Sequence, residues 1–199
     1  MKKREAEVLT IPKIEIGTVR IKVRGTTPLI VNNFSEKSKQ QMLDKQMKKA
    51  NTGREVKDPQ DQYERSLYKF SDGIRTGFPA VGFKAAMVRA STHLGMKMIN
   101  MQCLIHVMAD EGDLVEIKGE YHIREDIVRV ANGAPDVRFR AEYSAGWKAE
   151  LVINYLLNNI SPEQIAQLVV MAGFTCGIGE WRPGRAKTGN FGLFELNYD

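Results

Sequence analysis

The chain has 199 residues, of which 43% are hydrophobic and 27% charged, proportions that fit a folded domain and exclude a wholly disordered chain. No apolar run approaches the roughly 20 residues of a membrane helix and no secretion signal follows the basic start, so we expect a cytoplasmic protein with no membrane partner. The net charge is +5, but residues 1–57 hold 14 basic and 6 acidic residues, whereas residues 58–199 hold 15 and 18. This cationic first quarter suits a polyanion such as nucleic acid; a solvated basic surface without a partner is the alternative.

Residues 18–24 alternate apolar and basic side chains, which predicts a half-buried strand. Its inward positions are Val19, Ile21 and Val23. Its outward positions are basic and are expected to form a positive stripe: Arg20, Lys22 and Arg24. The segment Gly25-Thr26-Thr27-Pro28 ends the strand, and a short strand over 29–31 follows.

Residues 34–75 differ in character, since they are polar and rich in Lys and Gln, and include Lys37. We interpret them as an inserted basic arm, packed loosely on a single domain that spans residues 1–199. Asp58 followed by Pro59 predicts the start of a helix within the arm. The basic residues favour a contact role over a flexible surface loop without function.

Pro79 begins a predicted helix over 79–94, which Gly95 ends as a C-cap. Lys84 is expected in its first turn, where it would add a charge to the free N–H groups of the helix start. Arg89 follows five residues later, about 140° around the helix, so the two cations need not share a face. An anion site and a simple capped helix with solvated cations both remain open.

The following segments alternate between strands and one further helix. A buried strand is predicted over 101–108, and short strands over 114–117 and 127–130. Two well-patterned strands, 137–143 and 147–155, flank Ser144-Ala145-Gly146 and predict an antiparallel hairpin. A capping box at Ser161 begins a helix that ends at Gly173, and a closing strand is expected over 191–196. This order predicts an α+β fold with a ferredoxin-like antiparallel sheet and two packed helices.

The segment 177–192 combines five glycines with cations and a tryptophan. Glycines let a backbone approach a phosphate closely and bind anions through consecutive N–H groups. Arg182, Arg185 and Lys187 supply positive charge. Trp181 is expected either to stack on a base or to anchor the loop. The spacing is not that of a nucleotide P-loop, and a glycine-rich loop with incidental charges is the alternative.

Together these segments resemble the RAMP superfamily, the RRM-like proteins of CRISPR systems, and in particular the backbone subunit that coats guide RNA. The resemblance lies in three places: the turn from Gly25 to Ile30, the element from Phe78 through Lys84 to Arg89, and the loop with Gly177, Gly179, Gly189 and Gly192. It implies an RRM-like sheet with two helices, in subunits that stack head to tail along RNA. Val81-Gly82 stands where the family has Ser-Ser, and the chain is short for such a subunit, so a stand-alone or virus-borne relative is equally compatible.

We therefore expect a non-catalytic protein that binds RNA or single-stranded DNA and assembles head to tail, as a homo-oligomer or as a subunit of a ribonucleoprotein. The residues expected to contact the strand are Arg20, Lys22, Arg24, Lys37, Lys84, Arg89, Gly177, Gly179, Trp181, Arg182, Arg185, Lys187 and Gly189.

Two alternatives follow from the same residues. A RAMP-type, metal-independent endoribonuclease would need a positioned general acid or base, and the candidates are His93, His106 and His122. Cys103 and Cys176 lack metal-ligand spacing, so we expect no metal and no cofactor. The other alternative is a structural or decoy protein that uses the fold for protein contacts.

Overall fold

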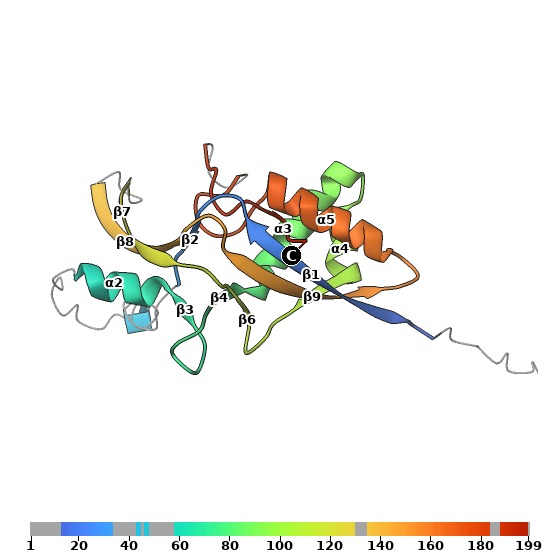
Figure 1. Cartoon of the computed structure of the whole chain (residues 1–199), viewed down its shortest axis with the longest axis horizontal. Helices are drawn as coiled ribbons and strands as arrows, with labels where there is room; N and C mark the ends of the chain where they lie inside the picture. The colour runs from blue at the N-terminus through green and yellow to red at the C-terminus, as the bar shows by residue number, and fades with distance from the viewer. Residues whose placement is uncertain are drawn as a thin grey trace, which may run out of the picture.

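The computed structural model describes residues 13–33, 43–44, 46–47, 58–129, 135–183 and 188–198. They form an elongated molecule, with the helices α3, α4 and α5 gathered towards one end and the strands β7 and β8 extending to the other (Figure 1). Among the described residues, no helix is long and apolar enough to cross a membrane.

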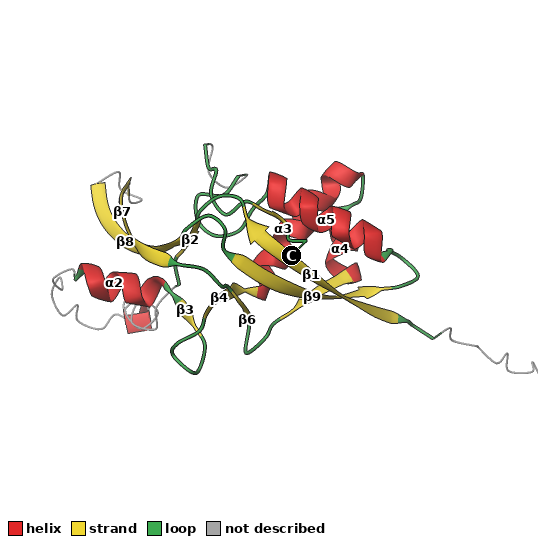
Figure 2. Cartoon of the chain, viewed as in Figure 1, coloured by secondary structure: helices red, strands yellow, loops and turns green. Residues whose placement is uncertain are grey.

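A four-stranded antiparallel sheet forms the larger half (Figure 2). Its strands lie in the order β10 (Phe194–Leu196), β1 (Ile16–Gly25), β9 (Lys148–Leu156) and β5 (Ile105–Met108). Two helices, α3 (Ala80–Ala90) and α5 (Pro162–Thr175), precede β5 and β10 and pack against each other. The resulting β-α-β-β-α-β order confirms the predicted α+β fold with an antiparallel sheet and two packed helices.

The core lies between this sheet and the helices. Val23 and Ile21 of β1 are buried and pair with Ala149 and Leu151 of β9, as the alternating pattern predicts. The helix α5 begins with the predicted capping box, in which Ser161 Oγ accepts from the N–H of Gln164 and the Gln164 side chain accepts from the N–H of Ser161. The sequence therefore predicts both the inward face of β1 and the start of α5 correctly.

The smaller half contains two further sheets. One has the order β2 (Leu29–Val31), β8 (Pro135–Tyr143) and β7 (Tyr121–Arg129). The other has the order β3 (Tyr68–Lys69), β4 (Thr76–Pro79) and β6 (Leu114–Glu116). The helix α2 (Pro59–Ser66) packs on β8.

Residues 58–75 of the predicted arm, unlike Lys37, lie among the described residues. Asp58 caps α2 and Pro59 is its first residue, both as predicted. This part is packed closely rather than loosely: Leu67 and Phe70 are buried, and Ser66 Oγ accepts from the N–H of Ala141 at 2.8 Å. Because these residues are buried, the segment that contains α2 is an integral part of the fold and not a loosely packed arm.

The hairpin predicted between 137–143 and 147–155 is wrong. The strand β8 pairs with β7 and β2, whereas β9 pairs with β1 and β5, so the two segments belong to different sheets. Gly25 contributes to the separation: its N–H donates to the carbonyl of Trp147, and the N–H of Gly146 donates to the carbonyl of Gly25. The intervening turn is thus held against the end of β1 and connects two sheets instead of closing a hairpin.

Two other boundaries also differ from the sequence prediction. The first half of the strand predicted over 101–108 is helical, since α4 (Met98–Leu104) precedes β5 and buries Met101 against the core. The helix predicted over 79–94 consists of α3 and a short 3-10 helix, η1 (Ser91–Leu94). Gly95 ends it with φ 74°, which confirms the predicted C-cap.

Candidate nucleic-acid interface

The candidate interface is built around α3. This helix buries Phe83, Met87 and Ala90 and leaves Val81 and Ala85 exposed, so its outer surface consists largely of small side chains. Lys84 is the fifth residue of α3 and not in its first turn, which corrects the sequence expectation. The N–H of Ala80 donates to the carbonyl of Asp113 at 2.8 Å, so the helix start is engaged within the protein.

A pocket lies between α3 and the beginning of the glycine-rich loop. Gly82, Ala85, Ala86 and Arg89 line it from the helix; Cys176, Arg182 and Pro183 line it from the other side. We call it the two-arginine pocket. Its volume is about 440 Å³, and none of the described residues that line it is acidic. Arg182 Nη1 donates to the carbonyl of Gly179 at 2.6 Å, which fixes this guanidinium at the pocket wall.

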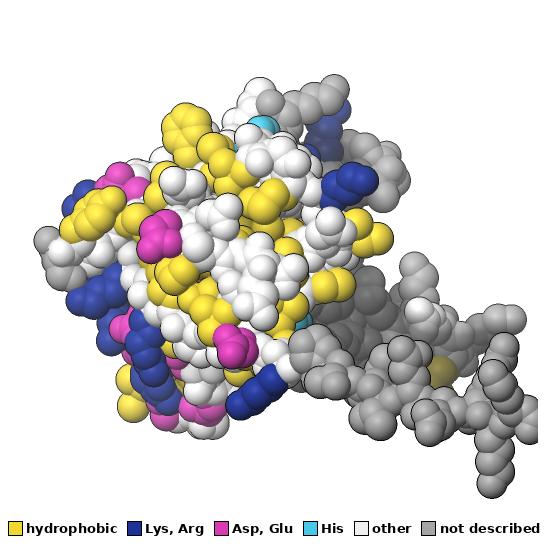
Figure 3. Space-filling view, turned by 90° about the vertical axis from the view of Figure 1, so that its right-hand side faces the viewer, with side chains coloured by type: hydrophobic (Ala, Val, Ile, Leu, Met, Phe, Trp, Pro, Cys, Tyr) yellow, Lys and Arg dark blue, Asp and Glu magenta, His cyan; other side chains and the backbone are white. Residues whose placement is uncertain are grey.

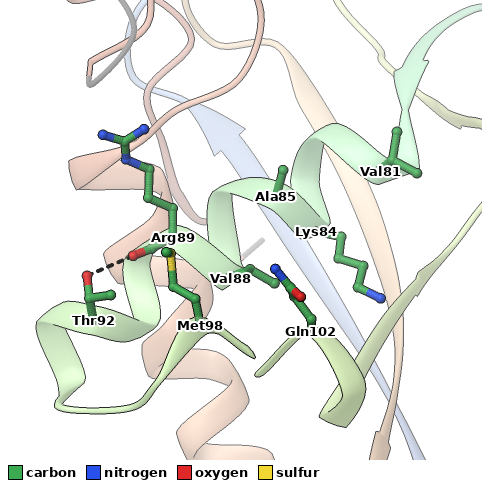
Figure 4. A pocket seen from close by; sticks show the side chains of 8 residues that line it. All are labelled: Val81, Lys84, Ala85, Val88, Arg89, Thr92, Met98 and Gln102. Atoms are coloured by element: carbon green, nitrogen blue, oxygen red, sulfur yellow. Dashed lines mark hydrogen bonds between the residues drawn. The ribbon is translucent and has the colours of Figure 1, made fainter. Parts of the chain in front are cut away.

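A second pocket lies between α3 and α4, on the other side of the same helix (Figure 4). Its volume is about 730 Å³, and we call it the methionine pocket because Met98 of α4 lines it. Ala85 and Arg89 line both pockets. Lys84 and Arg89 point to opposite sides of α3 in Figure 4, as the 140° separation predicts. One exposed helix therefore carries cations on two sides, with Ala85 between them.

Lys84 also meets a histidine of the sheet. Its Nζ lies 3.3 Å from Nδ1 of His106 on β5. The other two histidines lie elsewhere: His93 belongs to η1, and His122 Nε2 lies 3.5 Å from the Glu142 carboxylate on β8. His106 is thus the histidine that the described structure places beside a cation of α3.

The glycines of the loop are explained by close packing. A Cβ on Gly192 would lie 1.8 Å from the carbonyl oxygen of Ile178, and one on Gly179 would lie 2.5 Å from that of Ile30. A Cβ on Gly189 would meet the carbonyl oxygen of Trp181 at 2.1 Å. These glycines hold the two limbs of the loop together and let the loop pack closely against β2.

Backbone N–H groups in this loop donate to carbonyls within the protein. The N–H of Gly177 donates to Ala172 at 2.9 Å, that of Ile178 to Gly192 at 3.0 Å and that of Glu180 to Ile30 at 2.9 Å. This corrects the expectation that consecutive N–H groups at Gly177 would bind an anion. The loop contributes charge through its side chains, and its backbone serves to position them.

Trp181 lies over a charged surface of the smaller half. The guanidinium of Arg124 is 5.5 Å and that of Arg140 5.6 Å from its ring centre, and the Phe191 ring meets it edge-on at 6.1 Å. Cation–π contacts of this kind hold the ring on one face. The geometry favours loop anchoring, the second of the two roles that the sequence left open for Trp181.

The arginines beneath Trp181 belong to an ion-pair cluster on β7 and β8. Arg140 Nη2 lies 2.5 Å from Asp126, and Arg124 bonds to both Asp126 and Glu142. Arg140, Asp126 and Glu142 are all buried. Burial by itself would lower the pKa of Arg124, but its hydrogen bonds to Glu142 and Asp126 raise that pKa above the ordinary value. The alternation along residues 137–143 places Arg140 and Glu142 on one face of a strand, but it does not show that Trp181 and Phe191 of the glycine-rich loop lie over this cluster.

The outer face of the central sheet is less positive than the sequence suggested. Arg20 lies 3.0 Å from Glu150 on β9, and Arg24 lies 2.8 Å from Glu195 on β10. Lys22 points outward between them and pairs in register with Glu150. Acidic side chains on neighbouring strands thus offset the expected positive stripe.

Three other predicted contact residues, Lys37, Arg185 and Lys187, lie outside the described residues. Within the described ranges, no group of three or more His, Cys, Asp or Glu side chains is placed to hold a metal ion.

Comparisons with known proteins find similar solved structures but no matching family or curated protein. A chain in the cryo-EM structure of the type III-B Cmr-beta bound to cognate target RNA superposes with a TM-score of 0.47 at 11% identity, over 92% of the present chain and 59% of its own. Cmr6 from Pyrococcus furiosus superposes with a TM-score of 0.44 at 9% identity, over 93% of the present chain and 100% of its own. The present chain spans 59% of the length of the first of these chains.

Proposed function

We propose that the protein binds single-stranded RNA, without cleaving it, along the exposed side of α3. The observation that carries this proposal is the two-arginine pocket, in which Arg89 of α3 and Arg182 of the glycine-rich loop line one hollow without an acidic side chain among its described lining residues. Arginine is the side chain best suited to phosphate, because its planar guanidinium donates two parallel hydrogen bonds. RNA is preferred to single-stranded DNA on the strength of the sequence motifs that resemble RNA-coating subunits.

The small side chains of α3 support the same surface. Gly82, Ala85 and Ala86 line the two-arginine pocket, so a sugar-phosphate backbone can lie close to the helix there. The outer face of the sheet is a weaker candidate, since its arginines are already paired with glutamates. A phosphate at Arg20 or Arg24 would have to displace a carboxylate, whereas one at Arg89 and Arg182 meets no carboxylate among the described lining residues.

We further propose that subunits assemble head to tail along the strand. The two ends of the elongated molecule expose different apolar side chains: Ile123 and Ile127 on β7, and Ile14, Ile16 and Leu157 where β1 begins and β9 ends (Figure 1). Figure 3 looks onto the latter end and shows apolar side chains across much of its described surface. Unlike patches at opposite ends fit a heterologous contact, which generates open filaments.

The same proposal includes the predicted domain, the basic arm, the two further cations and the predicted location of the protein. In this proposal residues 1–199 act as one domain, and the basic arm over 34–75, including Lys37, contributes positive charge to strand binding. Arg185 and Lys187 contribute further positive charge. The protein works in the cytoplasm, either in a stand-alone assembly or within a larger ribonucleoprotein.

The salt dependence of RNA affinity tests the phosphate contacts. We expect the double variant Arg89→Gln/Arg182→Gln to bind a short unstructured RNA more weakly and to lower the slope of log affinity against log salt by about 0.7, because the two arginines share one phosphate and each phosphate contact to a single strand contributes about 0.7. The control is Arg20→Gln/Arg24→Gln, which removes the same net charge from the outer face of the sheet. Equal slopes for the two double variants would show that only overall charge matters and would contradict the proposed site.

A second candidate function, metal-independent cleavage of RNA, is favoured by one observation. Lys84 Nζ lies 3.3 Å from His106 Nδ1 beside the proposed strand path, and such a pair can supply the proton transfers of a general acid–base ribonuclease. Incubation of labelled hairpin RNA with the protein in EDTA separates the functions: a pure binder leaves the RNA intact. Specific cleavage that His106→Ala abolishes would favour the nuclease.

A further inference from the structure

We propose that the methionine pocket holds one unpaired nucleobase of the bound strand, an inference that rests on the proposed RNA binding. The pocket adjoins the two-arginine pocket across α3, because Ala85 and Arg89 line both. A strand whose phosphate binds at Arg89 and Arg182 therefore presents an adjoining nucleotide to the other side of the helix.

The walls of the pocket suit the face of a base. Val81, Val88 and Met98 line it, and Val88 is almost fully buried and forms part of the apolar surface. A methionine sulfur makes favourable contacts with aromatic rings, and its flexible side chain adapts to different ring sizes. Its volume of about 730 Å³ falls within the range of sites that hold small planar ligands.

Polar groups at the same pocket suit the edge of a base. Figure 4 shows the Gln102 side chain of α4 near Val88, on the side of α3 to which Lys84 also points. Within the described part of the chain, the Gln102 amide has no hydrogen-bond partner. A carboxamide presents a donor and an acceptor side by side, the arrangement that pairs with adenine and with other base edges. The pocket thus combines apolar walls, an amide and flanking cations, with no acidic residue in the lining that the structure describes.

Occupation by a base implies recognition of single strands, because a paired base cannot leave its stack without loss of stacking and pairing energy. A side chain of a neighbouring protein is the competing occupant. It is disfavoured because Lys84 and Arg89 on the rim match a polyanion, and because the pocket adjoins the proposed phosphate site.

The test compares two strands of equal length, an oligoadenylate and a ribose-phosphate chain that lacks every base. We expect the protein to bind the oligoadenylate at least tenfold more tightly at the same salt concentration, with similar salt slopes for both strands. Met98→Ala should weaken oligoadenylate binding about fivefold and leave binding of the baseless strand unchanged. Gln102→Leu should reduce the preference for oligoadenylate in the same way.

Met108→Ala is the matched control, since Met98 and Met108 are both 44% exposed and Met108 lies on the edge strand β5, outside the pocket lining. Equal affinities for the oligoadenylate and the baseless strand would overturn the base pocket, and so would equal effects of Met98→Ala and Met108→Ala. If binding still depended on salt in that case, the proposed RNA binding would stand. Absence of salt-dependent binding to either strand would overturn both. If Met98→Ala instead changed the oligomeric state without RNA and left RNA affinity unaltered, the occupant would be a second protein copy.

Discussion

Arg89 and Arg182 line the same pocket although they lie far apart in the sequence. The helix α3 supplies one arginine, and the loop that follows α5 supplies the other. Their approach depends on the packing of α3 against α5 and on the glycines that let the loop pack closely against β2. The proposed phosphate site is therefore a product of the tertiary fold, and changes that loosen the loop should affect it.

Gly192 should be far more sensitive to substitution than Gly73, although their φ angles are nearly equal, at 70° and 69°. A Cβ at Gly73 meets nothing within 4 Å, so Gly73→Ala carries only the cost of a left-handed conformation, about 1 kcal/mol. A Cβ at Gly192 would meet the Ile178 carbonyl oxygen at 1.8 Å, so Gly192→Ala should cost at least about 3 kcal/mol. Urea unfolding of the two variants measures the difference. Similar midpoints would show that the loop does not need this close approach.

Trp181→Ala should lower stability by about 2 kcal/mol, because it removes the contacts with Arg124, Arg140 and Phe191. Trp181→Phe retains an aromatic face for both guanidinium groups and should lose less than half of that amount. If Trp181 anchors the loop, the Phe variant should bind RNA within about twofold of the unmodified protein. A large loss of affinity in a variant of unchanged stability would instead assign Trp181 to base stacking.

Asp126→Asn should destabilise the protein by about 3–5 kcal/mol, the usual cost of leaving a buried charge without its partner. Asp126 bonds to both Arg124 and Arg140, and Arg140 is buried with it. Glu150→Gln is the contrasting change, since it breaks the exposed pair with Arg20 and should cost less than about 1 kcal/mol. Chemical denaturation of both variants decides whether the cluster on β7 and β8 supports the loop. Equal losses would contradict that role.

The turn between β3 and β4 should loosen in acid. The Asp72 carboxylate accepts from Arg75 Nε at 2.6 Å and from the N–H groups of Ile74 and Arg75, and the Arg75 hydrogen bond is the main cause that lowers its pKa from 3.8 to about 2. Because the folded-state pKa is depressed, the contribution of this carboxylate is fully present above its unfolded pKa and is lost as the pH falls through the folded value. Amide hydrogen exchange at Ile74 and Arg75 should therefore accelerate as the pH drops from near 3.8 towards about 2, relative to Gly73. In Asp72→Ala the exchange should be fast throughout; a pH-independent ratio in the unmodified protein would exclude the effect.

Local patterns predicted individual elements better than their pairing. The inward face of β1, the C-cap at Gly95 and the capping box at Ser161 follow from side-chain periodicity and capping chemistry, which act over a few residues. The separation of β8 from β9 was not predictable in this way, because both strands alternate and a short turn separates them. What decides their pairing is the docking of Gly25 and Gly146 at the end of β1, a contact between distant segments.

In the candidate site, too, local sequence patterns identified residues but not their contacts with distant segments. The sequence singled out Lys84, Arg89, Trp181 and Arg182 from their charge and the glycines around them. It did not reveal that Arg20 and Arg24 are paired with Glu150 and Glu195, since those carboxylates come from strands far away in the chain. It also missed Met98 and Gln102, because Gln102 lay in the strand predicted over 101–108 and Met98 lay in the connection before it, whereas both belong to α4. The alternation of Arg138, Arg140 and Glu142 signals one polar face, but only the tertiary structure shows that the loop covers it.

Ultraviolet cross-linking of the full-length protein to a short single-stranded RNA, followed by mass spectrometry of the linked peptides, tests the central claim most directly. We predict that the linked peptides come from α3 and α4, residues 81–102, and from the loop over 177–192. Links confined to β1 and β9 on the outer face of the sheet would contradict the assignment of RNA binding to the exposed side of α3.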